Sequence, residues 1–257
     1  MTVHYVYGVL PSEPELSALP SGPGGAAVRL VRGAGLTAAV SELPEERYGE
    51  EQFRAHAEDP VWLQELATAH HRVLAALADD EDVVPLRMPT LCRTQQRVVE
   101  LLEGRGPALR HALVAVRGRQ EWGVKLYAER QPEADQQVQA TSGRDYLGQR
   151  MAQGKAREDD RTRRGDAVRT CHDALASAAV DAVVGAPQDP ALTGRREPMV
   201  LNGAYLVDRE AADAFHAVVR EQAEGPCREA ALQLELTGPW PAYNFSQTPD
   251  QTGAGVP

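Results

Sequence analysis

The chain has 257 residues, a length typical of one large domain or two ordinary ones, and 42% of them are apolar. Aromatic residues are scarce at 5%, which favours a helix-rich α+β protein over an all-β barrel. The 27 basic and 37 acidic residues give a net charge of −10, and a surface of this sign repels phosphate backbones and anionic lipid headgroups. The composition therefore disfavours nucleic acid and bare membrane as partners.

The cysteines and the first residues bear on the compartment. Cys92, Cys171 and Cys227 are odd in number and far apart, which favours free, buried thiols in a reducing compartment. Residues 1–10 have no basic region followed by a long apolar region, so no signal peptide is predicted. No apolar stretch approaches the ~20 residues that span a bilayer, and we predict a cytoplasmic protein without a membrane span.

The first part of the chain alternates predicted strands with helices. Residues 3–10 are rich in β-branched and aromatic residues and predict a strand, and residues 28–43 predict a hairpin around Gly33-Ala34-Gly35. Asp59 and Pro60 predict the start of an amphipathic helix, because aspartate caps a helix and proline fits its first turn.

A second helix is expected to begin at Thr94. Gly104 and the Gly106-Pro107 pair are expected to break it, because glycine and proline disfavour a helix interior. Residues 114–128 then predict a long strand, in which Trp122 and every second residue after it lie on one face.

These elements predict four segments in chain order. Residues 1–130 are expected to form a ferredoxin-like antiparallel sheet with helices on one face. Residues 131–143 are polar and unpatterned, and they predict a linker. Residues 144–245 predict a helix-rich C-terminal domain with a long charged helix and a small β-α-β portion. Residues 246–257 have no aromatic or periodic content and predict a disordered tail.

The sequence offers few groups suited to catalysis. Cys171 and His172 are neighbours, so on a helix their side chains point about 100° apart and cannot face each other as nucleophile and base. His70 and His71 lack the i,i+4 spacing of a helical zinc motif. The glutamates of residues 45–51 lie in a polar stretch without the burial that would raise a carboxyl pKa. We therefore predict no catalytic, cofactor-binding or metal-binding residue.

Several segments resemble the GvpL/GvpF family of gas vesicle proteins, in register across residues 3–245. One departure is that the family usually follows Pro-Leu-Arg with Phe-Gly-Thr, whereas this chain has Met88-Pro89-Thr90, so the local backbone should differ. The segments that carry the resemblance are Tyr5-Val6-Tyr7-Gly8, His70-His71-Arg72-Val73-Leu74, Val84-Pro85-Leu86-Arg87, Glu121-Trp122-Gly123-Val124-Lys125, Ser142-Gly143-Arg144-Asp145-Tyr146-Leu147, Leu201-Asn202-Gly203-Ala204-Tyr205-Leu206-Val207 and Thr237-Gly238-Pro239-Trp240-Pro241.

The resemblance implies a non-enzymatic accessory protein of gas vesicle assembly, located in the cytoplasm with the vesicles and without a cofactor. Its implied partners are the hydrophobic shell protein and other accessory proteins, and a homo-oligomeric state is left open. An apolar shell subunit aggregates readily before it polymerises, and a soluble acidic binder would keep it in solution. The motif positions expected to have structural or partner-binding roles are Tyr7, His70, Arg87, Glu121, Trp122, Lys125, Tyr146, Asn202, Tyr205 and Trp240.

Two other functions and one open role remain at this point. The first alternative is a small-molecule enzyme on a ferredoxin-like α+β scaffold, which would need a pocket with convergent polar groups. The second is RNA binding, with Tyr5, Tyr7 and Tyr127 stacking on bases, which the acidic balance disfavours. Trp240, between two prolines, is expected either to anchor a core or to be an exposed binding residue.

Overall fold

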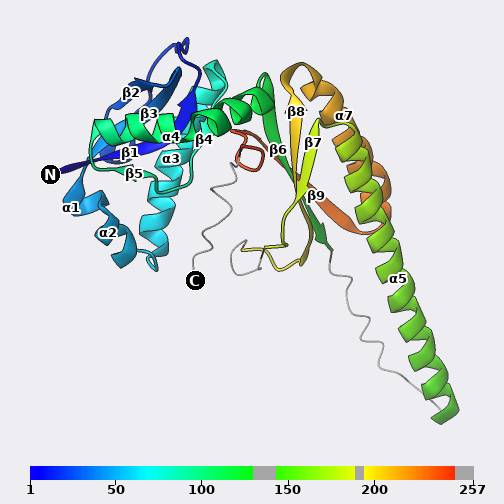
Figure 1. Ribbon diagram of the computed structural model, residues 1–257. Coiled ribbons are helices and arrows are strands. Elements are labelled where there is room, and N and C mark those ends of the chain that lie inside the picture. Colours follow the sequence, from blue (N-terminus) through cyan, green and yellow to red (C-terminus); the bar gives the residue numbers. More distant parts are fainter. Residues whose placement is uncertain (130–142, 189–193, 247–257) are drawn as a thin grey trace. The chain divides into compact units, whose positions relative to one another are not determined.

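The computed structural model describes most of the chain, and helices alternate with antiparallel strands along it (Figure 1). The predicted α+β class is therefore confirmed. No helix among the described residues is long and apolar enough to cross a membrane. The predicted linker at 131–143 and the predicted tail at 246–257 lie outside the described residues, except for Gly143 and Ser246. The described ranges are 1–129, 143–188 and 194–246.

The chain divides into two compact units, the first joining Met1–Glu121 to the chain from Trp240 onward and the second being Trp122–Pro239. One sheet of the first unit has the order β2-β3-β1-β4, and β5 also pairs with β1. The β2–β3 hairpin turns at Ala34 and Gly35, both with positive φ, as predicted. The strands, antiparallel at each of these pairings, are β1 (Thr2–Leu10), β2 (Val28–Gly33), β3 (Leu36–Pro44), β4 (Val84–Pro85) and β5 (Leu91–Cys92).

The two long helices of the first unit begin where the sequence predicts, whereas the two short helices within residues 45–55 were not predicted. The Asp59 carboxylate accepts from the backbone N–H of Val61 and Trp62 at the start of α3. The Thr94 hydroxyl accepts from the N–H of Arg97 at the start of α4. The helices are α1 (Glu45–Tyr48), α2 (Glu50–Ala55), α3 (Pro60–Asp80) and α4 (Gln95–Val116), with the 3-10 turn η1 (Pro23–Gly25) between β1 and β2.

The predicted break in the second helix was wrong. The α4 helix continues through Pro107 to Val116, and the following strand, β6, is Arg119–Ala128 rather than 114–128. Leu102 and Leu109 are fully buried on either side of the proline. Burial of this apolar face outweighs the loss of one backbone donor, which intrinsic propensity alone does not reveal.

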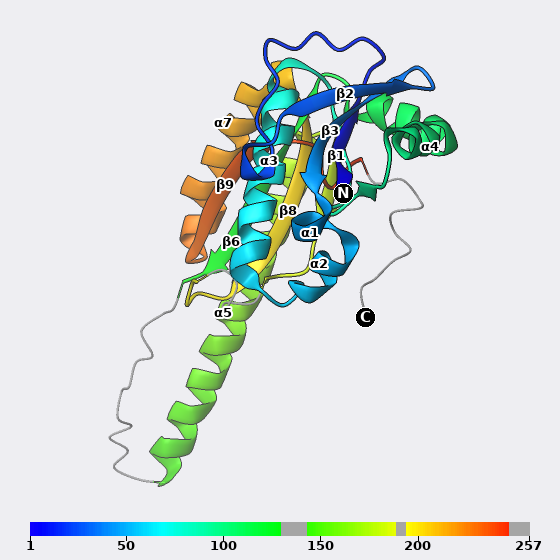
Figure 2. The same cartoon turned by 90° about the vertical axis from the view of Figure 1, so that its left-hand side faces the viewer.

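The helices of the first unit lie on both faces of its sheet, so the prediction of one covered face was wrong (Figures 1 and 2). A Cβ added at Gly8 of β1 would meet Leu74 of α3. A Cβ added at Gly33 of β2 would instead meet Val99 and Leu102 of α4. The unbroken burial of β1 from Tyr5 onward follows from this double cover, because both faces of the strand are removed from water.

The second unit has a sheet with the order β7-β8-β6-β9. Its first strand in chain order, β6, is a central strand of the sheet. One face packs against helices, and Trp122, Leu126 and Tyr205 share a core with Leu175 and Phe215. Beyond β6, the elements are α5 (Gly143–Ser177), β7 (Asp181–Val184), β8 (Met199–Asp208), the 3-10 turn η2 (Arg209–Ala211), α7 (Ala212–Gln222), the π-helical turn η3 (Ala223–Cys227) and β9 (Leu232–Trp240).

We predict that Leu74→Ala and Leu102→Ala each lower the free energy of unfolding by about 2–5 kcal/mol, because each leaves a cavity under a different helix. The measurement is urea denaturation of the full chain, with Val114→Ala, an exposed position of α4, as the control. A near-neutral Leu102→Ala would mean that α4 does not cover the sheet.

Candidate functional site

A buried group of tyrosine and histidine side chains lies between β1 and α3. The period-two alternation of β1 places Tyr5 and Tyr7 on the same face, toward His70. The Tyr5 hydroxyl lies 2.9 Å from His70 Nδ1, and the Tyr7 hydroxyl donates to Ser41 Oγ at 2.9 Å. The His70 ring also bonds to the Leu86 carbonyl, which leaves Nδ1 to accept from Tyr5.

Burial keeps this group uncharged near neutral pH. Desolvation lowers the pKa of His70 to about 4 and raises the pKa of Tyr7 to about 12. The pKa of Tyr5 is raised far above its ordinary value for the same reason. Tyr5 and Tyr7 are fully buried and Tyr127 nearly so, and their burial opposes the RNA-stacking alternative that the acidic balance already disfavours.

A second polar group joins α3 and β6 to the C-terminal segment of the first unit, residues 240–246. The Tyr243 hydroxyl lies 3.0 Å from His71 Nδ1, and the Trp240 ring packs edge-on against His71, with ring centroids 4.8 Å apart. Asn244 donates from its backbone N and its Nδ2 to the Glu121 carboxylate, at 2.8 and 2.6 Å. Trp240 is thus half-buried in an internal contact, which favours its core role over the exposed one.

Glu121 is the buried carboxylate of this second group. Its side chain is 4% exposed, and burial raises its pKa although the two Asn244 donors act in the opposite direction. The two hydrogen bonds from Asn244 take the place of water molecules that the Glu121 carboxylate loses on burial. The Glu121 position therefore has a structural role within the first unit.

The motif residues of the second unit also have internal partners. The Trp122 ring packs edge-on against His216, with centroids 4.3 Å apart, and the Tyr205 hydroxyl lies 3.0 Å from His172 Nδ1. Asn202 Nδ2 donates to the Ala186 carbonyl at 3.0 Å. These contacts position buried rings and one loop, although Trp122 Nε1 and His216 Nε2 are buried without a hydrogen-bond partner.

The prediction of free, buried thiols is confirmed for all three cysteines. Cys171 is hydrogen-bonded to Cys227 inside the second core, and this bond together with burial raises the pKa of Cys171. A thiol held in the protonated form is a poor nucleophile. His172, its neighbour in sequence, instead contacts Tyr205.

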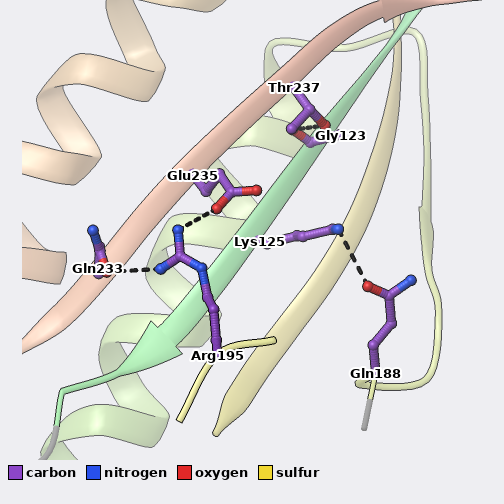
Figure 3. Close-up of polar contacts among 7 residues, drawn as sticks. All are labelled: Gly123, Lys125, Gln188, Arg195, Gln233, Glu235 and Thr237. Atoms are coloured by element: carbon purple, nitrogen blue, oxygen red, sulfur yellow. Dashed lines mark hydrogen bonds and ion pairs between the residues drawn. The ribbon is translucent and has the colours of Figure 1, made fainter. Parts of the chain in front are cut away.

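The face of the second sheet opposite its helices carries a polar network (Figure 3). Arg195 donates to Gln233 Oε1 at 2.9 Å and to the Glu235 carboxylate at 2.5 Å, and its guanidinium lies 4.3 Å from the Tyr127 ring centroid. Lys125 Nζ donates to Gln188 Oε1 at 3.2 Å. These contacts attach the chain between β7 and β8 to β6 and β9.

The remaining predicted positions lie apart from these groups. Arg87 is exposed between β4 and β5. Tyr146 lies in α5, and its side chain is outside the described part of the structure. Met88 packs against the first core, as expected for an apolar replacement of an aromatic residue, and its peptide bond with Pro89 is cis.

Two features bear on the enzyme alternative. Within the described residues, no group of three His, Cys, Asp or Glu side chains is placed to hold a metal ion. The paired glutamates of α1 and α2 line an open groove of about 510 Å³, where Glu50 pairs with Arg54 at 2.6 Å with both side chains exposed. Exposed carboxylates of this kind are solvated and lack the burial that tunes a general acid or base.

Sequence reasoning missed the partners that complete the buried groups. Each partner lies far away in the sequence, at a separation of at least 65 residues. The pairs are Tyr5 with His70, His71 with Tyr243, and Asn244 with Glu121. Arg195 had no motif to indicate it. The sequence did contain one signal of these buried groups: Tyr5 and Tyr7 are two residues apart in a strand, so their side chains lie on the same face.

The fold and these contacts define a two-unit α+β protein in which many of the described motif side chains make internal contacts. The chain belongs to the gas vesicle synthesis protein GvpL/GvpF family, whose model matches residues 3–247. It is 38% identical over 255 residues to gas vesicle protein L of a Streptomyces species, covering 95% of this chain and 92% of that protein. It is 26% identical to gas vesicle protein F2 of Halobacterium salinarum, covering 94% and 90%.

Solved structures of the same family share the fold. The gas vesicle protein GvpF from an Anabaena species matches with a TM-score of 0.70 at 20% identity, over 96% of this chain and 97% of that one. GvpF from Microcystis aeruginosa matches with a TM-score of 0.65 at 20% identity, over 96% and 100%. Family membership supports an accessory role in gas vesicles.

We predict that acid weakens the first unit through His70. Its pKa is about 4 in the folded protein, against 6.5 for a histidine exposed to water, so between these values the unfolded state binds more protons and stability falls as pH falls. The free energy of unfolding should drop by up to about 1.4 kcal/mol per pH unit, and less in His70→Gln. Urea denaturation at several pH values measures this, with the exposed His111→Gln as control. Equal slopes in wild type and His70→Gln would contradict it.

We further predict that Asn244→Ala lowers the free energy of unfolding by about 1–3 kcal/mol, because the buried Glu121 carboxylate loses a side-chain donor. Asn202→Ala, which removes a donor from a half-exposed site, serves as the control and should cost less. Thermal and urea unfolding of both variants measure the difference. Equal losses would show that Glu121 does not depend on Asn244.

Proposed function

We propose that this protein binds the hydrophobic gas vesicle shell protein and other accessory proteins during vesicle formation, in the cytoplasm and in association with the vesicles. The observation that carries the proposal is the family match across residues 3–247. The internal use of the motif side chains supports it, because rings and carboxylates held in cores are not arranged around a substrate. The protein would act by holding another polypeptide, without a catalytic step.

The chemistry of the shell supports such a role. A protein that encloses gas presents an apolar face, and a subunit with that face aggregates before it is assembled. A binder with a net charge of −10 adds like-charge repulsion, which keeps the complex in solution. The apolar contact itself must come from side chains that the binder leaves exposed.

Two places in the second unit expose apolar side chains. Leu147 and Met151 are one turn apart on α5, whose described residues from 144 to 166 include no buried side chain. Figure 1 shows this half of α5 extending beyond the sheet of its own unit. Val183 and Val184 are exposed on β7. A polar helix and an apolar edge strand without cover both suit partner contacts.

The strand order also supports a finer description of the fold. The second unit has the chain order β-α-β-β-α-β, from β6 to β9, which is that of the ferredoxin-like motif. The first unit has the corresponding strand order, with a loop and η1 in place of its first crossover helix. We propose that both units are ferredoxin-like, the first in a modified form. The wide use of this motif makes it no guide to function.

The proposal predicts that the tagged full-length protein, crosslinked in vesicle-forming cells, recovers the shell protein and other accessory proteins. Mass spectrometry identifies the crosslinked peptides, and cells lacking the shell gene provide the control. Recovery of neither shell nor accessory proteins would contradict the proposed function. A bound small molecule that raises the melting temperature would favour the enzyme alternative.

A further inference from the structure

The outer strand of the second sheet, β7, is short, and no described strand pairs with its outer side. It pairs with β8 on one side only, from Asp181 opposite Leu206 to Val184 opposite Gly203 (Figure 1). Val183 is 39% exposed and Val184 53% exposed, and Val200 of β8 adds a third exposed valine. We call Asp181–Val184 together with Val200 the β7 edge.

The backbone of the β7 edge leaves hydrogen-bonding groups directed outward. Gly185 N donates to the Asn202 carbonyl, so alternation directs Val183 toward β8 and directs Ala182 and Val184 away from it. The Ala182 N–H is taken by the Asp181 carboxylate at 2.8 Å. No described residue bonds to the outward N–H and C=O of Val184 or to the Ala182 carbonyl. These groups can pair with a further strand.

The outer strands β2 and β9, by contrast, carry features that oppose pairing. β2 carries Arg29, which pairs with Glu42, and also Arg32. β9 carries Glu235 and, near its end, Pro239. Charged side chains and proline at a sheet edge prevent unwanted strand addition. The β7 edge has no Lys, Arg or Pro, and residues 182–188 are uncharged.

We propose that the β7 edge binds an extended apolar segment of the gas vesicle shell protein as an added strand. This rests on the proposed function. Beyond Asp181 the edge is uncharged and aliphatic, so it matches an added strand that is itself uncharged and apolar. A second copy of this chain fits less well, because each copy brings a net charge of −10 and an Asp181 at the edge.

The test compares binding of shell protein, dissolved from purified vesicles in urea and diluted onto the immobilised full-length protein. Val184→Pro removes the outward N–H and keeps the bond from the Gly185 amide to the Asn202 carbonyl of β8. Val184→Lys adds a charge at the edge, which also opposes strand addition. It provides the test if the proline variant does not fold. Val114→Lys is the matched control, because Val114 is 59% exposed and lies on α4.

We expect both Val184 variants to bind shell protein roughly tenfold more weakly, the effect of about one hydrogen bond. The Val114 variant should bind like wild type, and thermal unfolding confirms folding of each variant. Wild-type affinity in both folded Val184 variants would overturn the edge proposal while leaving the proposed function intact. Failure of the wild type to bind would instead overturn the shell-binding part of the proposed function, and the edge proposal with it. A dimer in wild type that becomes a monomer in Val184→Pro, measured by light scattering, would assign the edge to a second copy and overturn the proposal.

Discussion

The structure depends on the pairing of polar side chains that folding removes from water. A buried hydroxyl, imidazole or carboxylate without a partner destabilises the protein, so a buried polar group is most stable when it meets a partner inside the same unit. In the first unit the Tyr5–His70 and Glu121–Asn244 pairs meet this requirement. The second pair also fixes the returning C-terminal segment to that unit. Side chains that look functional in the sequence are thereby placed by internal chemistry.

Local signals in the sequence predicted several elements well. The helix start at Asp59 and the hairpin at Ala34 and Gly35 depend on a few adjacent residues, and the structure contains both. The continuation of α4 through Pro107 could not be predicted in this way, because its stability comes from burial against a sheet that is distant in sequence. The continuous apolar run of β1 did indicate that both faces of the strand are buried, since a half-exposed strand would alternate apolar and polar residues.

The candidate site was less predictable than the fold. The motif segments located Glu121 and Trp240, but their partners Asn244 and His71 are separated from them by more than a hundred residues. No periodicity or spacing links residues so far apart. The pKa shift of His70 is likewise a tertiary property, because it results from burial between β1 and α3.

The outer strands of the two sheets differ in the side chains that they carry. Arginines on β2 and the glutamate and proline of β9 limit pairing, whereas β7 exposes valines and backbone groups that no described residue bonds. A protein that keeps its cores closed and one edge open is suited to hold an apolar polypeptide. This is the physical form that an accessory role in vesicle assembly would take.

Amide hydrogen exchange of the full-length protein, alone and with shell protein, tests this account most directly. It predicts slower exchange at the Val184 amide when shell protein is bound, with unchanged protection of the buried β1 and α3 amides around Tyr5 and His70. Slower exchange confined to the glutamate groove of α1 and α2, with β7 unchanged, would contradict it.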